Sequence, residues 1–346
     1  MPAAAPPAVL LIQTAFIGDV ILATALLEYL HRTEPDTPVD FLVRRGNESL
    51  LKGHPQVRQV LVWDKKQDKY QGLLRLLGHI RRSNYGRVVT LQRFASTGLL
   101  TAFSGAPERV GFDKNPLARF FTRTAPHVLE AGVHEVTRNL RLLAPDYQGP
   151  VVPPRLYPSA DDEQAAAEAV AAAGGGPYIC IAPTSVWFTK QFPEQQWLKL
   201  LAALPPDYTV FLLGGPPDTA ACQRLLEQSG RPGSVNLSGR LSLLASAALM
   251  RGAMLNYVND SAPMHLCSAV GAPVCAVYCS TVPAFGFGPL SPFSRIVEIE
   301  GPLPCRPCGL HGHAACPLGH FRCAHDIRTE QLLAVLGQAQ GGMVNG

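Results

Sequence analysis

Short apolar runs alternate with helical patterns along most of this 346-residue chain. Apolar runs without polar alternation are typical of strands that are covered on both faces, and strands that alternate with helices favour a parallel, doubly wound sheet. The pattern therefore predicts an α/β protein with two Rossmann-like parallel sheets. The predicted strands lie at 9–12, 39–43, 57–63, 87–91, 178–182, 209–213, 235–237, 253–258 and 274–278.

A proline-rich segment separates the two series of strands. Residues 144–158 contain five prolines, and proline does not fit the interior of a helix or of an inner strand. We therefore predict one Rossmann-like domain over 1–150, a linker and helix over 151–176, a second Rossmann-like domain over 177–325 and a terminal helix over 326–346. Two such domains would face each other across a cleft, where ligands commonly bind.

The charge of the chain is unevenly distributed. Hydrophobic residues make up 47% and charged residues 16%, as in a globular protein with large cores. Residues 1–160 carry 20 Lys and Arg against 13 Asp and Glu, whereas residues 161–346 carry 10 against 13. The positive half suggests an anionic partner, although solvated helix faces would produce the same count. No nucleic-acid partner is expected.

The beginning of the chain indicates a cytoplasmic protein. Residues 1–7 contain no basic residue, and Gln13 and Asp19 break the apolar run that follows. We therefore expect neither a secretory signal nor a membrane-spanning helix, which needs about 20 apolar residues. Five of the nine cysteines lie in or beside apolar runs and fit small core residues: Cys180, Cys222, Cys267, Cys275 and Cys279.

The turn after the run at 253–258 is a candidate anion site. Asp260 and Ser261 are capping residue types, and Pro263 suits the first turn of a helix. A helix should therefore begin at the carboxyl edge of a parallel sheet. The free N–H groups and the positive dipole end of such a helix attract anions, although an ordinary capped helix would have the same sequence.

The first strand-to-helix turn has a different character. Residues 15–19 contain one glycine and lack the G-x-G-x-x-G fingerprint, which argues against a nicotinamide enzyme. The carboxylate of Asp19 is unsuited to holding a pyrophosphate at this turn. It could instead accept a proton from a substrate hydroxyl, and an N-capping aspartate is the alternative interpretation.

Polar residues follow two strands of the second half. Thr184 and Ser185 offer hydroxyls and backbone N–H groups at the end of a strand, and Lys190 adds a positive charge. This combination suits a diphosphate, whereas a surface loop with one lysine is the plain alternative. Two glycines that allow close backbone approach and an aspartate that could bind a ribose hydroxyl follow the next strand: Gly214, Gly215 and Asp218.

Four cysteines near the C-terminus have the spacing C-x2-C-x7-C-x6-C, with histidines between them. This spacing is compatible with a structural zinc or iron–sulfur site. The spacing between the second and third cysteines is shorter than in common zinc ribbons. The alternative is therefore a loop with reduced or disulfide-paired cysteines. A metal here would stiffen a loop and would not perform chemistry. The cysteines are Cys305, Cys308, Cys316 and Cys323.

Together these motifs resemble the ADP-heptose:lipopolysaccharide heptosyltransferases, especially the type II enzymes. The resemblance covers nearly the whole chain and depends on the order of the motifs. It implies the two-domain glycosyltransferase B fold, with an acceptor-binding N-terminal domain, a nucleotide-sugar-binding C-terminal domain and a tail helix that packs back on the N-terminal domain. The motifs are Ile17-Gly18-Asp19, Thr184-Ser185 with Lys190-Gln191-Phe192-Pro193, residues 236–243, residues 259–265, and the tail from Cys305-Arg306-Pro307-Cys308 to Cys323.

The resemblance also implies an activity and residue roles. Heptose would move with inversion from ADP-heptose to a lipopolysaccharide core acceptor, with no cofactor or catalytic metal, and Asp19 would be the general base. Lys190 and the helix start at 261–263 would stabilise the leaving ADP. The implied donor-binding residues are Thr184, Ser185, Lys190, Gly214, Gly215, Asp218, Leu241, Asp260, Ser261, Ala262 and His265. The candidate acceptor contacts in the positive half are Arg44, Arg45, Arg93, Lys114 and Arg119.

The chain departs from the family pattern at one turn. The family usually has Asp-Ser-Gly or Asp-Thr-Gly, whereas this chain has Ala262 and then Pro263. Alanine adds a methyl group where the backbone would approach phosphate, and proline removes a donor. The alternatives are another nucleotide-sugar donor, a non-catalytic nucleotide-binding module, or a metal-dependent interaction module at 305–323. A lipopolysaccharide acceptor would bring the protein into transient contact with the inner face of the inner membrane.

Overall fold

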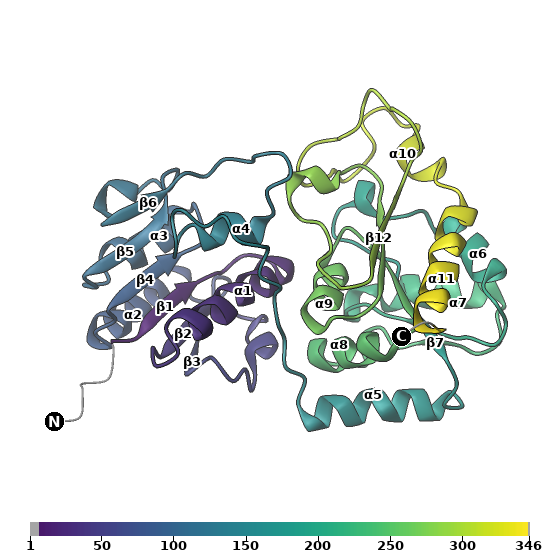
Figure 1. The fold of residues 1–346 in the computed structure, drawn as a ribbon, viewed down its shortest axis with the longest axis horizontal. Coiled ribbons are helices and arrows are strands. Elements are labelled where there is room, and N and C mark those ends of the chain that lie inside the picture. Colours follow the sequence, from purple (N-terminus) through teal and green to yellow (C-terminus); the bar gives the residue numbers. More distant parts are fainter. Residues whose placement is uncertain (1–6, 345–346) are drawn as a thin grey trace. The chain divides into compact units, whose positions relative to one another are not determined.

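The structure is a computed structural model that describes residues 7–344 (Figure 1). The chain forms two compact units, Met1–Tyr157 and Pro158–Gly346. Each unit contains a six-stranded parallel sheet with helices around it. This confirms the predicted α/β class with two Rossmann-like parallel sheets.

The sheet of the first unit has the strand order β3-β2-β1-β4-β5-β6. All four residues of β1 are buried, as expected for a central strand with both faces covered. The strands are β1 (Val9–Ile12), β2 (Val39–Arg44), β3 (Gln59–Trp63), β4 (Arg87–Thr90), β5 (Glu108–Phe112) and β6 (Arg123–Ala125). The helices are α1 (Ile17–Thr33), α2 (Lys69–Arg82), α3 (Ala95–Ala102) and α4 (Glu135–Leu140), with short 3₁₀ turns η1 (Glu48–Leu51) and η2 (Ala118–Phe120).

The sheet of the second unit has the strand order β12-β11-β10-β7-β8-β9. Its strands are β7 (Tyr178–Ala182), β8 (Thr209–Leu212), β9 (Ser234–Asn236), β10 (Leu255–Asn259), β11 (Val274–Tyr278) and β12 (Ser294–Glu298). Its helices are α5 (Ala160–Ala172), α6 (Glu194–Ala203), α7 (Thr219–Ser229), α8 (Leu243–Gly252), α9 (Ala262–Val270), α10 (Arg322–His325) and α11 (Thr329–Val344), with 3₁₀ turns η3 (Phe188–Lys190), η4 (Pro216–Asp218) and η5 (Pro283–Phe285).

The sequence analysis missed β5, β6 and β12. These strands carry charged residues and have no long apolar run. In the first unit, ion pairs between side chains link neighbouring strands: Glu108 contacts Arg87 at 2.6 Å and Arg123 at 2.9 Å. Because these charged side chains pair with one another, they can occupy strand positions where an apolar residue would otherwise be expected. A search for apolar runs therefore does not find these strands.

The terminal helix α11 corrects an expectation. It was expected to pack back on the N-terminal domain, but its apolar side belongs to the core of the second unit, near α6 (Figure 1). Leu332 is fully buried there, and the hydroxyl of Tyr257 donates to its carbonyl oxygen at 3.0 Å. The helix packs this way because Leu332, Val335, Leu336 and Ala339 recur at helical spacing and form one apolar stripe.

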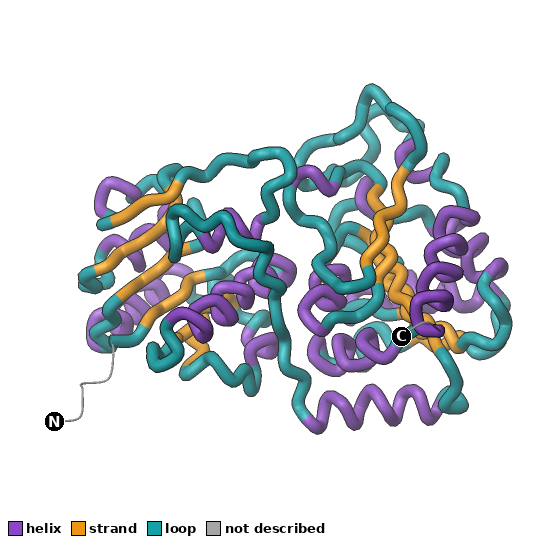
Figure 2. Tube along the Cα trace, in the orientation of Figure 1, coloured by secondary structure: helices purple, strands orange, loops and turns teal. Residues whose placement is uncertain are grey.

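The segment between β12 and α11 is mostly loop, as Figure 2 shows. It carries the four spaced cysteines. Among residues 7–344, none of the helices combines the length and the apolar character that crossing a bilayer requires.

Replacing Leu332 with alanine tests the packing of α11. The change removes a fully buried side chain from the second core, so we expect a loss of about 2–5 kcal/mol in the unfolding free energy. Glu330→Ala, at an exposed position on the same helix, should lower the unfolding free energy far less. Calorimetric unfolding with hydrogen exchange measures both. Equal stability of the two variants would contradict this packing.

A buried histidine makes the first unit sensitive to acid. The ring of His54 packs edge-on against Tyr157, with ring centroids 4.7 Å apart. Burial lowers the pKa of His54 to about 4, against weaker opposing effects of Glu28 and the Arg155 backbone. Because the unfolded chain has a pKa near 6.5 at this position, the unfolded state takes up the proton first as the pH falls.

We therefore expect the first unit to lose stability as the pH falls from about 6.5 to about 4, with His54 contributing roughly 3 kcal/mol. This loss is absent above about pH 6.5 and reaches its full, constant value below about pH 4. His54→Gln should flatten this part of the pH dependence, whereas His31→Gln, at an exposed position, should not. Thermal unfolding across this pH range is the measurement, and an unchanged pH dependence in His54→Gln would contradict it.

Candidate functional site

Asp19 lies at the carboxyl edge of the first sheet, in the first turn of α1. One carboxylate oxygen accepts a hydrogen bond from the N–H of Phe16 at 3.2 Å. The side chain is half-exposed, so it caps the helix and still reaches the surface. The capping role and the proton-accepting role that the sequence left as alternatives are therefore compatible.

A buried ion pair lies close to Asp19. Burial raises the pKa of Glu135, at the start of α4, and the charge of Asp19 adds to this, whereas Arg138 opposes it. Arg138 is almost fully buried; its guanidinium lies 2.8 Å from Glu135 and donates to the carbonyl oxygen of Val133 at 2.6 Å. The sequence analysis missed this pair. Oppositely charged residues at i and i+3 in a short helix were its only signal.

A polar network also surrounds the loop before Asp19. The ammonium of Lys65 donates to the hydroxyl and the carbonyl of Thr14 at 2.8 and 3.1 Å, and the hydroxyl of Thr14 donates to the side-chain carbonyl of Gln92 at 2.5 Å. Burial, and then the charge of Arg44, lowers the pKa of Lys65 to about 8. This lysine was not among the predicted site residues. It joins the end of β3 to the end of β1, and Thr14 extends the network to the end of β4.

The five expected acceptor contacts fall into two groups. Arg44 and Arg45 end or follow β2. The guanidinium of Arg44 lies 4.8 Å from the ring centroid of Phe16, close to the Asp19 turn, whereas Arg45 forms an ion pair with Asp64 at 2.7 Å. The other three lie on the segments next to α3: Arg93, Lys114 and Arg119.

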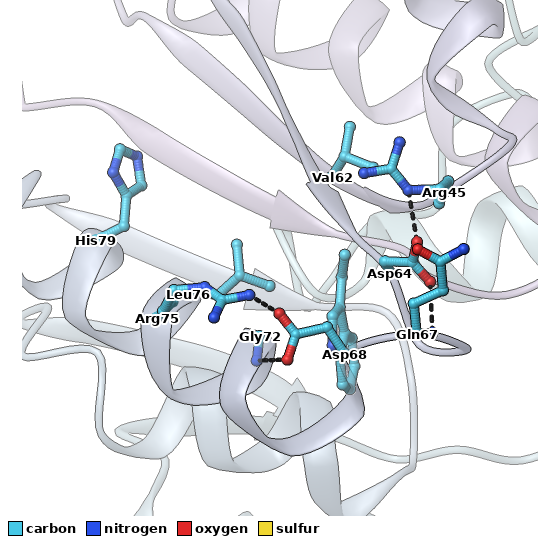
Figure 3. Close-up of a pocket in the computed structure, with 10 residues that line it drawn as sticks. Arg45, Val62, Asp64, Gln67, Asp68, Gly72, Arg75, Leu76 and His79 are labelled. Carbon is cyan, nitrogen blue, oxygen red and sulfur yellow. Dashed lines mark hydrogen bonds and ion pairs between the residues drawn. The ribbon is translucent and has the colours of Figure 1, made fainter.

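A cavity of about 400 Å³ lies between β3 and α2 (Figure 3). Figure 3 shows that Arg45 points toward Asp64 and Arg75 toward Asp68. The amide of Gly72 also donates to Asp68, at 2.9 Å. Each of the two guanidinium groups that line the cavity is therefore held by a carboxylate of the same wall.

The structure brings two of the expected donor residues together in the second unit. The ammonium of Lys190 lies 2.7 Å from the carboxylate of Asp260, which also accepts from the hydroxyl of Thr281 at 2.7 Å. The strands β7 and β10, which precede these residues, are neighbours in the sheet. Asp260 is largely buried, so it holds the lysine in a fixed place at the carboxyl edge.

Asn259 is a positioning residue to which the sequence analysis gave no role. It ends β10 and is fully buried. Its side-chain amide donates to the carbonyl of Pro183 at 2.9 Å, and its side-chain oxygen accepts from the N–H of Phe192 at 2.8 Å. It therefore closes both ends of the loop that carries Thr184, Ser185 and Lys190. A polar side chain at the end of a buried strand was the available signal.

The helix α9 begins at Ala262, as the capping residues predict. Pro263 has no N–H, and the N–H of Met264 donates to the carbonyl of Ser261 at 3.1 Å. Among the first three residues of the helix, Ala262 alone can offer its N–H to a ligand. The positive end of the helix dipole is present, but this helix start offers fewer free N–H donors than one without proline. His265 follows as a buried residue.

The glycines after β8 serve their own loop. Asp218 accepts a hydrogen bond from the N–H of Gly215 at 2.8 Å, and a Cβ atom at position 214 would lie 2.7 Å from the Cβ of Asp218. The aspartate itself therefore requires a glycine at Gly214. The amide of Gly239 donates to Gly214 at 2.9 Å, which holds the half-buried Leu241 near the same edge.

The cysteine-rich segment packs against the Lys190 loop. The N–H of Thr189 donates to His313 at 3.1 Å, and the N–H of His313 donates back to the hydroxyl of Thr189 at 2.7 Å. Gly312 has φ +81°, and a Cβ atom there would lie 3.0 Å from Cγ of Lys190. Arg306 donates to the carbonyl of Thr281 at 2.7 Å. The segment therefore supports both sides of the Lys190–Asp260 pair.

All nine cysteines are thiols in the structure. Burial would raise the pKa of Cys316, but backbone N–H groups of residues 318–321 hydrogen-bond to its sulfur and bring the pKa below its ordinary value. Within residues 7–344, no three His, Cys, Asp or Glu side chains are arranged to hold a metal ion. The predicted core cysteines are buried: Cys180, Cys222, Cys267, Cys275 and Cys279.

Known proteins match the chain in sequence and in fold. Residues 73–312 match the model of glycosyltransferase family 9 (heptosyltransferase). Lipopolysaccharide heptosyltransferase 1 of Pseudomonas aeruginosa is 27% identical over 344 residues, which cover 94% of this chain and 92% of that protein. Lipopolysaccharide heptosyltransferase 2 of Escherichia coli is 24% identical over 308 residues, which cover 84% and 88%.

The solved structure of E. coli ADP-heptose lipopolysaccharide heptosyltransferase II has the same fold, with a TM-score of 0.79 at 23% identity, and the match covers 96% of this chain and 99% of that one. The family model spans well over half of the chain. The protein therefore belongs to glycosyltransferase family 9, the heptosyltransferases, and has the glycosyltransferase B fold.

Proposed function

We propose that this protein transfers heptose, with inversion, from ADP-heptose to a lipopolysaccharide core acceptor. The Lys190–Asp260 pair, at the carboxyl edge of the second sheet, is the observation that carries the proposal. The names of the relatives support the substrates: two are lipopolysaccharide heptosyltransferases, and the E. coli structure is named for ADP-heptose.

The second unit holds the donor in this proposal. Thr184, Ser185 and Lys190 bind the diphosphate, and the start of α9 adds its positive dipole end. Asp218 and Leu241 contact the nucleoside, and Asp260 and His265 lie near the sugar and the phosphates. The C–O bond between heptose and ADP breaks in the reaction, so negative charge develops on the diphosphate. A fixed lysine stabilises that charge without reorganisation.

The first unit supplies the base and binds the acceptor. The acceptor hydroxyl attacks the anomeric carbon of the heptose from the face opposite ADP, and its proton passes to the half-exposed oxygens of Asp19. Arg44, beside the Asp19 turn, binds an anionic group of the acceptor. Because this acceptor is anchored in the membrane, the reaction takes place at the cytoplasmic face of the inner membrane.

One observation favours a second candidate, a non-catalytic nucleotide-binding module. Ala262 and Pro263 leave the start of α9 with few N–H donors, which weakens the binding of the diphosphate in the transition state. The polar network around Asp19 favours catalysis, because a binding module has no need of a base. Another nucleotide-sugar donor remains the third candidate.

Replacing Asp19 with asparagine tests the base. Asparagine keeps an oxygen that can accept from the Phe16 N–H, so α1 stays capped, but it cannot take a proton. We expect kcat for heptose transfer from ADP-heptose to fall by about 10²–10⁴, while the affinity for ADP stays unchanged. A coupled assay of ADP release with calorimetric titration measures both.

Asp162→Asn is the matched control, because Asp162 caps α5 from the same third position of its helix. It should keep the parent activity. If Asp19→Asn retained full kcat, the base assignment would be wrong; if it lost ADP binding, Asp19 would belong to the donor site. A parent protein that binds ADP and turns over no sugar donor would favour the non-catalytic module.

Replacing Lys190 with glutamine tests the diphosphate site. Loss of a charge-assisted contact should weaken ADP binding by about 10- to 100-fold. Because Asp260 then keeps an unpaired charge, the double variant Lys190→Gln/Asp260→Asn should recover part of the loss. Calorimetry with ADP, UDP and GDP, with and without magnesium, also identifies the nucleotide.

Lys199→Gln, on the exposed side of α6, is the control and should leave ADP binding unchanged. Tighter binding of UDP or GDP than of ADP would move the function to another sugar donor. If Lys190→Gln bound ADP as tightly as the parent, Lys190 would not be part of the diphosphate site.

A further inference from the structure

Helices α2 and α3 form one layer on the first sheet. Leu73 and Ile80 of α2 share a core with Leu100 of α3, packed against Ile12 and Val88 of the strands. The two helices contact each other, so their outward sides are continuous. We call these outward sides, together with the adjoining segments 93–94 and 114–120, the α2–α3 face.

Large apolar side chains are exposed on the α2–α3 face. Tyr70 is 73% and Leu74 65% exposed, one turn apart on α2. Phe103, at the end of α3, contacts Phe120, with ring centroids 5.7 Å apart. Phe94 is exposed where α3 begins. A helix on the surface of a globular protein normally turns polar residues outward, so these side chains indicate that another apolar phase meets this face.

Basic residues surround the apolar ones. Helices α2 and α3 with the segments 93–94 and 114–120 contain seven Lys and Arg, all exposed, and no Asp or Glu. Arg75 forms an ion pair with Asp68, which lies just before α2. Arg81 and Arg82 are exposed in the last turn of α2.

Cations and aromatic rings are combined within this face. The ammonium of Lys69 lies 5.2 Å from the ring centroid of Tyr70, and the guanidinium of Arg119 lies 4.7 Å from that of Phe120. Each pair presents an apolar ring and a positive charge at the same point. Aromatic and basic residues together are typical of surfaces that lie in the interface of a bilayer.

The segments around α3 are held rigidly. Asn115 is buried and donates to the carbonyls of Gln92 at 3.0 Å and Phe94 at 3.2 Å. A Cβ atom at Gly98 would lie 2.2 Å from the side-chain oxygen of Asn115, so the glycine lets this loop approach α3. The backbone of the exposed Phe94 is therefore anchored to the 114–120 segment.

We propose that the α2–α3 face docks on an anionic membrane surface. The apolar side chains enter the headgroup region, and the basic residues bind lipid phosphates. A second copy of this chain would bring two strongly positive faces together, which disfavours it as the occupant. Arg93, Lys114 and Arg119 then contact lipid. The proposal rests on the proposed function in one respect, namely that a membrane-anchored acceptor explains why the protein would dock on a membrane.

Flotation with lipid vesicles tests the docking in the absence of donor and acceptor. The full chain should bind vesicles of phosphatidylcholine with phosphatidylglycerol, should not bind phosphatidylcholine alone, and should dissociate as salt is added. Each basic residue near such a surface contributes about fivefold to binding. Arg81→Glu/Arg82→Glu should therefore weaken binding by at least about 25-fold. Tyr70→Ser/Leu74→Ser should also weaken it, with little risk to the fold because both side chains are exposed.

Two control variants make the test specific. Lys199→Glu/Arg224→Glu changes the net charge by the same amount in the second unit, and Val128→Ser/Leu129→Ser removes two exposed apolar side chains outside α2 and α3. Both should bind vesicles like the parent, and circular dichroism verifies the fold of all variants.

Three results would overturn the proposal. The first is that Arg81→Glu/Arg82→Glu binds vesicles like the parent, and the second is that the charge control loses as much vesicle binding as this variant. The third is that the parent binds no vesicles and forms a dimer that Tyr70→Ser/Leu74→Ser disrupts. The last result would make a second copy the occupant. Because no sugar donor is present, the vesicle result does not depend on whether the protein transfers heptose.

Discussion

Parallel pairing of β10 with its neighbours is the constraint on which the proposed donor site depends. Because β7, β10 and β11 run side by side in the same direction, their carboxyl ends deliver Lys190, Asp260 and Thr281 to one place. Asn259 then joins the loop after β7 to the end of β10. The pair of charges follows from this strand order, and removing one hydrogen-bonding side chain at a strand end would loosen several candidate contacts together.

The two units use the carboxyl edges of their sheets in different ways. The first presents a half-exposed carboxylate, with the half-buried ammonium of Lys65 and the buried Glu135–Arg138 pair in the same unit. The second presents an ammonium held by a carboxylate and supported by the cysteine-rich segment. That segment has a mechanical role in this structure, because Thr189, Arg306 and Gly312 connect it directly to the lysine loop.

The sequence was sufficient to predict the fold class and the main strands, since an apolar run between helical patterns is a local signal. It failed for β5 and β6, where charges that pair across strands replace apolar residues, and for β12, whose Arg295 and Glu298 find partners outside the sheet. The unit against which α11 packs was also not predicted correctly. An apolar stripe indicates that a helix packs on something, but it does not indicate on which surface. Candidate residues such as Lys190 and Asp260 could be found from motifs. The roles of Asn259 and Lys65 could not, because their hydrogen-bond partners are distant in the chain.

The capping bond of Asp19 has a consequence for its proposed role as the base. A free aspartate side chain on a surface samples several rotamers, and ordering it in the transition state costs entropy. Here the amide of Phe16 already holds one carboxylate oxygen, so the direction of the second oxygen is set by the backbone of α1. The helix start thus does for the carboxylate what an orienting third residue does for the base of a catalytic triad.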